Sequence, residues 1–81
     1  MARKHPKATE RKLGRHKAMG LAWEDGTIEV DPRQTGKEYL DTLIHEGMHV
    51  KFPKWSERVV AANSKWFADY LWKNNVRIIK P

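Results

Sequence analysis

The sequence is organised around the short stretch His45-Glu46-Gly47-Met48-His49, in which two histidines stand four positions apart. On an α-helix such residues lie one turn apart on the same face, so both imidazoles can bind one metal ion. Glu46 is offset from His45 by about 100° around the helix and therefore points beside the metal. A carboxylate in that position can serve as general base for a metal-activated water. The motif predicts a helix that carries a catalytic metal centre.

The size and composition of the chain make a bound ion useful for stability. A chain of 81 residues forms one small domain, and cores of this size often depend on disulfides or a structural ion. There is no cysteine, which excludes disulfides and thiolate zinc sites and fits a reducing compartment. No apolar run reaches membrane-spanning length, and no apolar signal region follows the basic N-terminus. We expect a soluble, cytoplasmic protein that makes no contact with membranes.

The net charge of +6 is concentrated near the N-terminus. Residues 1–17 contain seven of the sixteen Lys and Arg residues, with Glu10 as the only acid, whereas the remaining nine basic and nine acidic residues cancel. Such an arm can contact nucleic acid or an acidic partner through residues 3–17, or it can be a solvated tail. We therefore expect residues 1–17 to form a partly disordered arm and residues 18–81 to form a single metal-binding domain.

A β-hairpin is predicted before the motif. Two β-prone runs, residues 18–23 and 27–30, flank Glu24-Asp25-Gly26, and Asp-Gly between such runs is a strong hairpin signal. Ile28 and Val30 alternate with polar residues, which indicates a strand with one buried face. Two further segments are candidate strands: residues 13–16, which would extend the first strand, and residues 76–79, which would join the hairpin.

The helix that carries the motif is predicted to begin near Thr35 and to run to about Lys51. Thr35-Gly36-Lys37-Glu38 has the form of a capping box, although a start at Asp31 is also possible. On this helix the apolar side chains and the polar side chains gather on opposite faces. The apolar face contains Leu40, Leu43, Ile44, Gly47 and Val50, and the polar face contains Glu38, Thr42, His45 and His49. Because mid-helix glycine is unfavourable, we expect a neighbouring element to approach Gly47 closely.

A second helix is predicted from Ser56, a good N-cap, to Asn74-Asn75, which suits a left-handed C-cap. Its core face is expected to be a stripe of mostly aromatic residues: Val59, Asn63, Trp66, Phe67 and Tyr70, with Val60 and Leu71 at the edge. The short connection makes this helix antiparallel to the first. The predicted fold class is α+β, with a small β-hairpin or short antiparallel sheet packed on two helices, the first of which carries the motif.

A catalytic zinc site usually has three protein ligands, so one more is needed. The available side chains are Glu57, Asp69, Asp41 and the tail histidines His5 and His16. His49 lies near the end of the first helix, so only the opening turns of an antiparallel second helix can come close to it. Glu57 is in that turn, whereas Asp69 lies about 18 Å further along. We expect Glu57 to be the third ligand, although the helix dipole alone also favours a first-turn glutamate.

Asp41 and Thr42 lie one turn before His45. Either can hydrogen-bond an imidazole and fix its tautomer, as outer partners of metal ligands do, or both are ordinary exposed helix residues.

Three segments carry a resemblance to a known family: Ile28-Glu29-Val30-Asp31-Pro32, residues 40–49 with the motif, and Phe52-Pro53 followed by Trp55-Ser56-Glu57. Together they resemble the small zinc peptidases of phages and bacteria, which look like minimal gluzincins related to the thermolysin-type and SprT-like peptidases. The resemblance covers about residues 19–79, and Gly47 departs from it because such helices commonly carry a larger apolar residue there.

The resemblance implies a role for each matching position. His45, His49 and Glu57 would bind one Zn²⁺ ion, and Glu46 would be the general base. The strand at Ile28, Glu29 and Val30 would bind an extended peptide substrate. The family also uses a downstream Tyr, His or Arg to stabilise the oxyanion, and Tyr70 and Arg77 are the candidates by elimination. A phage-encoded chain would act in the host cytoplasm.

The leading hypothesis is therefore a zinc-dependent peptidase that hydrolyses peptide bonds. The alternative is a non-catalytic, zinc-stabilised binding module whose basic arm contacts nucleic acid or a protein. A third possibility is a metal-free helical protein with a chance motif, whose folding would be indifferent to chelators. Imidazole and carboxylate ligands suit zinc but also admit other divalent first-row ions.

Overall fold

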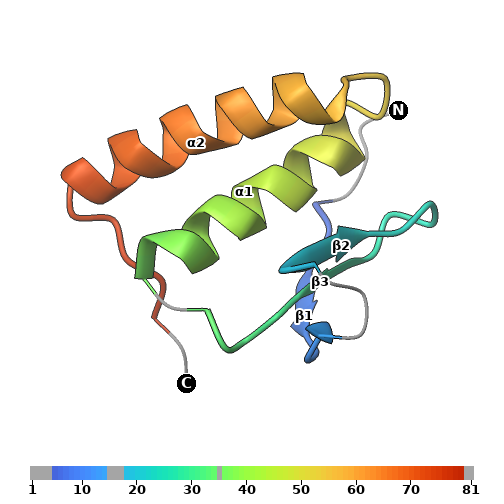
Figure 1. Cartoon of the computed structure of the whole chain (residues 1–81), viewed down its shortest axis with the longest axis horizontal. Coiled ribbons are helices and arrows are strands. Elements are labelled where there is room, and N and C mark those ends of the chain that lie inside the picture. The colour runs from blue at the N-terminus through green and yellow to red at the C-terminus, as the bar shows by residue number, and fades with distance from the viewer. Residues whose placement is uncertain (1–4, 15–17, 35, 80–81) are drawn as a thin grey trace.

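The computed structural model describes residues 5–14, 18–34 and 36–79. Its elements follow the order β1, β2, β3, α1, α2 (Figure 1). They are the strands Ala8–Glu10 (β1), Gly20–Ala22 (β2) and Ile28–Val30 (β3) and the helices Gly36–Lys51 (α1) and Glu57–Lys73 (α2). The chain is a small α+β protein in which α1 lies between α2 and the sheet. None of the described helices has the length and apolar character needed to cross a membrane.

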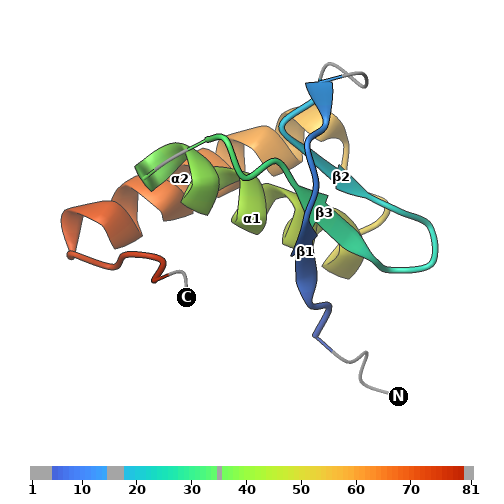
Figure 2. The same cartoon turned by 90° about the horizontal axis from the view of Figure 1, so that it is seen from below.

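The predicted hairpin is confirmed. β2 pairs with β3 in antiparallel register, with Leu21 opposite Glu29. The turn between them contains Gly26 at φ 91°, and the Asp25 carboxylate accepts hydrogen bonds from the N–H and hydroxyl of Thr27. The prediction of an antiparallel sheet is wrong, because β1 adds to the other edge of β3 in parallel and gives the order β1-β3-β2 (Figure 2).

The N-terminal segment belongs to the fold, contrary to the predicted boundary at residue 17. β1 pairs with β3 through main-chain N–H and C=O groups. Every non-proline residue has both groups, so the basic composition of the N-terminal segment does not prevent this pairing. Leu13 is fully buried and does not extend β2. The Arg11 guanidinium lies 2.6 Å from the Glu29 carboxylate, so part of the basic charge is compensated within the sheet. Residues 1–4 and 15–17 of the predicted arm lie outside the described residues.

Asp31, directly after β3, holds the N-terminal segment in place through hydrogen bonds. Its buried carboxylate accepts hydrogen bonds from the Arg33 side chain (2.6 and 2.9 Å) and from the main-chain N–H of Leu13 (2.9 Å) and Arg33 (2.9 Å). The Arg33 guanidinium, followed by the Leu13 N–H, holds the pKa of Asp31 well below its usual range. The bonds therefore tie the N-terminal segment to the end of β3.

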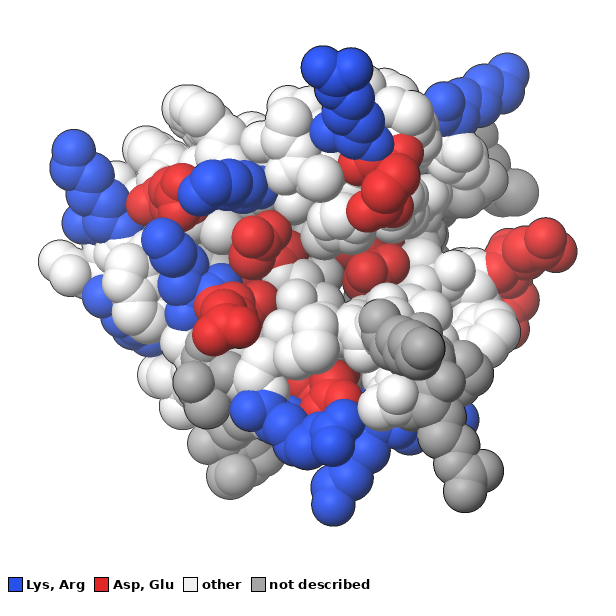
Figure 3. All heavy atoms as spheres, viewed as in Figure 1, with Lys and Arg blue, Asp and Glu red and all other residues white. Residues whose placement is uncertain are grey.

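Charges are unevenly distributed on the face that Figure 3 shows. Carboxylates gather across the middle of this face, and Lys and Arg side chains project mainly from its periphery. The net positive charge of the chain therefore does not extend over this central region.

The main core lies between the sheet and α1. Ile28 and Val30 pack on Tyr39, and Ala8, Leu43 and Val50 pack around them. Tyr39 was not among the predicted core residues; its hydroxyl donates to Glu10 Oε2 (2.8 Å) and so links α1 to the end of β1. The predicted end of α1 at Lys51 is confirmed, whereas the predicted cap Thr35 lies outside the described residues.

Both predicted caps of α2 are confirmed. The Ser56 hydroxyl accepts a hydrogen bond from the N–H of Val59 (3.2 Å). At the other end Asn75 has φ 65°, and the N–H of Val76 donates to the carbonyl of Leu71 (2.9 Å). This Schellman-type cap ends the helix, and residues 76–79 form no strand, contrary to prediction.

The predicted core face of α2 is wrong. The buried residues of this helix are the small ones, Val60, Ser64 and Ala68, whereas Trp66 is 60% and Tyr70 52% exposed. Small side chains let the two helices approach each other, and the aromatic stripe is turned away from α1.

Close backbone approach to α1 occurs at Gly20 and not at Gly47. A Cβ atom on Gly47 would meet nothing within 4 Å. A Cβ on Gly20 would lie 2.6 Å from Thr42 Cγ2 and 2.9 Å from Glu46 Cγ. β2 therefore rests directly on the part of α1 that carries the motif, because Gly20 has no side chain.

Candidate metal centre

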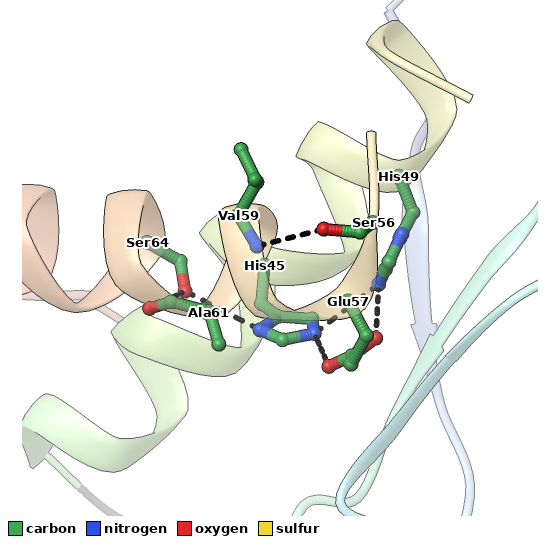
Figure 4. A network of polar contacts seen from close by, with 7 residues as sticks. All are labelled: His45, His49, Ser56, Glu57, Val59, Ala61 and Ser64. Carbon is green, nitrogen blue, oxygen red and sulfur yellow. Dashed lines mark hydrogen bonds and ion pairs between the residues drawn. The ribbon is translucent and has the colours of Figure 1, made fainter. Parts of the chain in front are cut away.

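The side chains of His45, His49 and Glu57 converge between the end of α1 and the start of α2 (Figure 4). Nε2 of His45 lies 2.6 Å from Oε1 of Glu57, and Nε2 of His49 lies 2.7 Å from Oε2. The two Nε2 atoms are 3.2 Å apart. The structure thus brings Glu57 to both imidazoles, as expected for a third metal ligand.

The connection between the helices places Glu57 at this point. The chain reverses over residues 52–56, where the rings of Phe52 and Trp55 stack with centroids 4.0 Å apart. Ser56 then caps α2, so that Glu57 is its first residue and faces the last turns of α1. Its side chain remains 70% exposed, which leaves the site open on one side.

Ser64 orients His45, a role that the sequence analysis did not assign. Nδ1 of His45 lies 3.3 Å from the Ser64 hydroxyl oxygen, and that hydroxyl donates to the carbonyl of Ala61 (3.2 Å). The oxygen therefore accepts a hydrogen bond from Nδ1–H and leaves Nε2 with its lone pair. Ser64 lies seven residues after Glu57, which is about two turns along the same face of α2. This spacing is the sequence feature by which Ser64 could have been identified.

This tautomer makes the convergence chemically informative. The Nε2 lone pair of a neutral His45 faces a carboxylate oxygen at 2.6 Å and a second imidazole nitrogen at 3.2 Å. Such atoms repel one another unless a cation lies between them. One proton satisfies one of these contacts at a time, whereas one metal ion binds all three groups. Two imidazole nitrogens and a carboxylate are a ligand set typical of catalytic zinc, so the residues fit a metal centre.

Glu46 lies beside this group and is only 8% exposed, under β2. Burial raises the pKa of Glu46, and the positive charge that His45 and His49 carry when they are protonated partly opposes this rise. For Glu57 burial also raises the pKa, but the hydrogen bond from His49 and the charges of both imidazoles outweigh it and the pKa is lowered. The buried carboxylate is thus the stronger base, and the exposed one is ionised and suited to bind a cation.

Two pockets meet at the site. The larger, about 530 Å³, follows β2 to Trp23 and is also lined by Val50 and Pro53; we call it the Trp23 pocket. The smaller, about 300 Å³, extends toward Met19 and Asp41 and is called the Asp41 pocket. Both pockets are lined by Ala18, Gly20, His45, Glu46 and Glu57. Together they form a groove along β2 with the candidate metal ligands at its centre.

Comparison with known proteins adds no family to this picture. No protein-family model, no curated protein and no solved structure matches the sequence. The chemistry of the site is therefore argued from its geometry.

The predicted substrate strand, Ile28, Glu29 and Val30, is not available to a peptide. β3 is the central strand, both its edges are paired, and Ile28 and Val30 are buried. β2 is the edge strand beside the site. The main-chain N–H of Asp31 donates to the carbonyl of Met19, and the N–H of Trp23 donates to the carbonyl of Thr27. In an antiparallel pair, hydrogen-bonded and non-hydrogen-bonded residues alternate. The main-chain N–H and C=O groups of Gly20 and Ala22, which lie between the bonded positions, therefore point away from β3. Among the described residues, β2 is therefore the strand with an open edge beside the site.

Thr42 and Asp41 are near the site but do not hold the imidazoles. The Thr42 hydroxyl donates to Gln34 Oε1 (2.8 Å), and Gln34 Nε2 donates to the carbonyl of Met19 (3.1 Å), so Thr42 fixes the start of β2. Asp41 lines its pocket and, within the described part of the chain, makes no hydrogen bond to either imidazole. The position predicted for them beside His45 is taken by Ser64.

Tyr70 and Arg77, the candidate oxyanion stabilisers, lie away from the site. Tyr70 stacks on Trp66, and the Arg77 guanidinium lies 3.4 Å from the centre of the Trp72 ring and donates to the Trp72 carbonyl. Tyr70 is thirteen residues after Glu57, about 20 Å along the helix. The antiparallel course of α2 carries both residues to the far end of α1.

Proposed function

We propose that this chain is a zincin-like metallopeptidase in which His45, His49 and Glu57 hold one zinc ion and Glu46 is the general base. The observation that carries the proposal is the convergence of the three metal-binding groups beside a buried carboxylate and an open strand edge. A purely structural site would not need Glu46 or the groove.

Each part of the site has a defined task in peptide hydrolysis. When bound, the zinc ion supplies Lewis acidity, which lowers the pKa of water and polarises the peptide carbonyl. Glu46 accepts the proton of the attacking water and passes it to the leaving amine. Gly20 and Ala22 pair with the main chain of the substrate by β-augmentation. Ser64 keeps the metal-binding nitrogen of His45 directed into the site.

Metal analysis tests the ligand set. Purified, chelator-free protein should contain about one zinc per chain, and His49→Ala and Glu57→Ala should lose it. Glu38→Ala, which removes an exposed carboxylate from α1 outside both pockets, is the control and should retain it. No stoichiometric metal in the wild-type protein would contradict the proposal.

Glu46→Gln tests catalysis separately. It should keep the metal, because Glu46 is not a ligand, and should lose cleavage of a quenched fluorescent peptide by roughly 10²- to 10⁴-fold, the usual contribution of a general base. Unchanged cleavage by this variant would exclude the mechanism.

A non-catalytic zinc-stabilised binding module is the second candidate, favoured by exposed cations of the N-terminal segment such as Lys7 and Lys12. It predicts nucleic-acid binding that weakens steeply with salt and does not change in Glu46→Gln.

A further inference from the structure

The two halves of the groove differ in chemistry. The apolar residues that line the Trp23 pocket include Ala22, Val50 and Pro53. The Trp23 indole donates its N–H to Glu29 (2.6 Å), on the face of the sheet opposite the one that Ile28 and Val30 pack against α1. The Asp41 pocket instead carries a carboxylate beside the hydroxyl-bearing Thr42. A peptide lying along β2 therefore meets apolar side chains on one side of the candidate metal centre, with Glu24 at the far end, and a polar, acidic surface on the other side.

The Asp41 carboxylate differs from the carboxylates of Asp31 and Asp69, which have cationic partners. Asp31 is paired with Arg33, and Asp69 is held between Lys37 and Lys65. Asp41 lines a pocket and has no cationic partner among the residues that the structure describes. A carboxylate in a pocket without a cation is the complement of a Lys or Arg side chain on a ligand.

The charge of the occupied site points the same way. Two positive charges on the metal would balance Glu46 and Glu57, which leaves Asp41 and, at the other end of the groove, the exposed Glu24. The groove is therefore acidic, although the chain as a whole has a net charge of +6. Such a groove attracts cationic peptides and disfavours acidic ones.

We propose, on the basis of the peptidase function above, that the preferred substrates are peptides that place a Lys or Arg side chain in the Asp41 pocket and an apolar side chain in the Trp23 pocket. β2 runs from the Asp41 pocket toward the Trp23 pocket. In an antiparallel pairing with β2 the basic residue therefore lies on the C-terminal side of the cleaved bond, and the apolar residue lies on the N-terminal side.

The test compares peptides that differ at one position on the C-terminal side of the cleaved bond, where Lys, norleucine or Glu is placed. Norleucine keeps the aliphatic chain of Lys and removes its charge. The zinc-loaded wild-type protein should cleave the Lys peptide about tenfold better than the norleucine peptide, as expected for a hydrogen bond to a charged partner, and the Glu peptide least well. Mass spectrometry of the products identifies the cleaved bond.

Variants assign the preference to Asp41. Asp41→Asn should abolish the Lys preference, and Asp41→Lys should reverse it in favour of the Glu peptide, while the matched control Glu38→Gln should keep it. Zinc content and thermal unfolding establish that each variant is folded and loaded. Cleavage that depends on Glu46 but shows no preference for Lys, or a preference that persists in Asp41→Asn, would overturn the substrate class and leave the peptidase function intact. If the zinc-loaded protein cleaves none of the peptides and Glu46→Gln binds none of them, the peptidase function and the substrate class both fail.

Discussion

Gly20→Ala tests whether the contact between β2 and α1 sets the geometry of the site. The new Cβ would lie 2.6 Å from Thr42 Cγ2, where contacts between carbon atoms are normally at least about 3.5 Å. Thr42 cannot turn aside freely because its hydroxyl is bonded to Gln34. β2 must therefore move away from α1 by about 1 Å, and such overpacking costs about 1–3 kcal/mol of unfolding free energy.

The same movement should reduce catalysis more than metal binding. All three proposed ligands belong to α1 and α2 and would keep their positions, whereas the edge of β2, where we propose that substrate binds, would shift relative to Glu46. A misplacement of this size costs about 100-fold in rate. Gly20→Ala should thus keep about one zinc per chain and lose about two orders of magnitude in kcat/KM.

Gly47→Ala is the matched control. The same methyl group meets nothing within 4 Å there, and alanine is favoured over glycine inside a helix by about 1 kcal/mol. This variant should be slightly more stable and fully active. Urea unfolding measures the stability of the two variants, metal analysis their zinc content, and peptide cleavage their activity. If Gly20→Ala has wild-type stability and activity, or if Gly47→Ala is equally damaging, the close contact at Gly20 does not position the site.

Three further perturbations test other parts of the structure. Ser64→Ala should weaken zinc binding by about 10- to 100-fold in a chelator competition without unfolding the protein, because His45 loses the partner that fixes its tautomer. Leu13→Ala should lower the unfolding free energy by about 2–5 kcal/mol in urea, and an effect below 0.5 kcal/mol, typical of exposed sites, would show that the N-terminal segment is not part of the fold. Burial, with the hydrogen bond to Glu10, raises the pKa of Tyr39 from 10.0 to about 12. Since the folded-state pKa is the higher one, the resulting stability is present below pH 10 and is lost between pH 10 and 12, and Tyr39→Phe should flatten this part of the pH–stability profile.

The features that the sequence predicted correctly depend on short-range chemistry. The Asp25-Gly26 turn, the Ser56 cap and the left-handed Asn75 each require a particular residue type at one position, so the residue type identifies the structure. Glu57 could be placed because a short connection restricts which turn of the second helix can reach His49. The contact between Ser64 and His45 could be predicted in the same way, because Ser64 lies two turns after Glu57 on the same face of α2.

The features that the sequence did not predict depend on long-range packing. β1 pairs with β3 across some twenty residues, and neither its charge nor its length distinguishes it from a tail. On α2 the aromatic stripe is the more hydrophobic face by residue type, because the buried residues Val60, Ser64 and Ala68 are small. Periodicity reports that a helix is amphipathic, but the separation of the two helices decides which face is buried. The family resemblance implied that the strand Ile28–Val30 binds substrate, and the pairing of β1 that encloses this strand could not be predicted from the sequence.

The position of the proposed ligands would also let a bound ion stabilise so short a chain. His45 and His49 belong to α1 and Glu57 to α2, so a bound ion would cross-link the helix pair in a chain that has no disulfide. Binding that occurs only in the folded state adds to its stability, and metal removal should therefore lower the melting temperature. Because Glu46 is proposed to act in catalysis and lies outside the ligand group, Glu46→Gln should show the same chelator-induced shift as the wild-type protein, whereas Glu57→Ala should show little or none. An equal shift in all three proteins would mean that the stabilising ion binds elsewhere, and the metal centre would have to be reassigned.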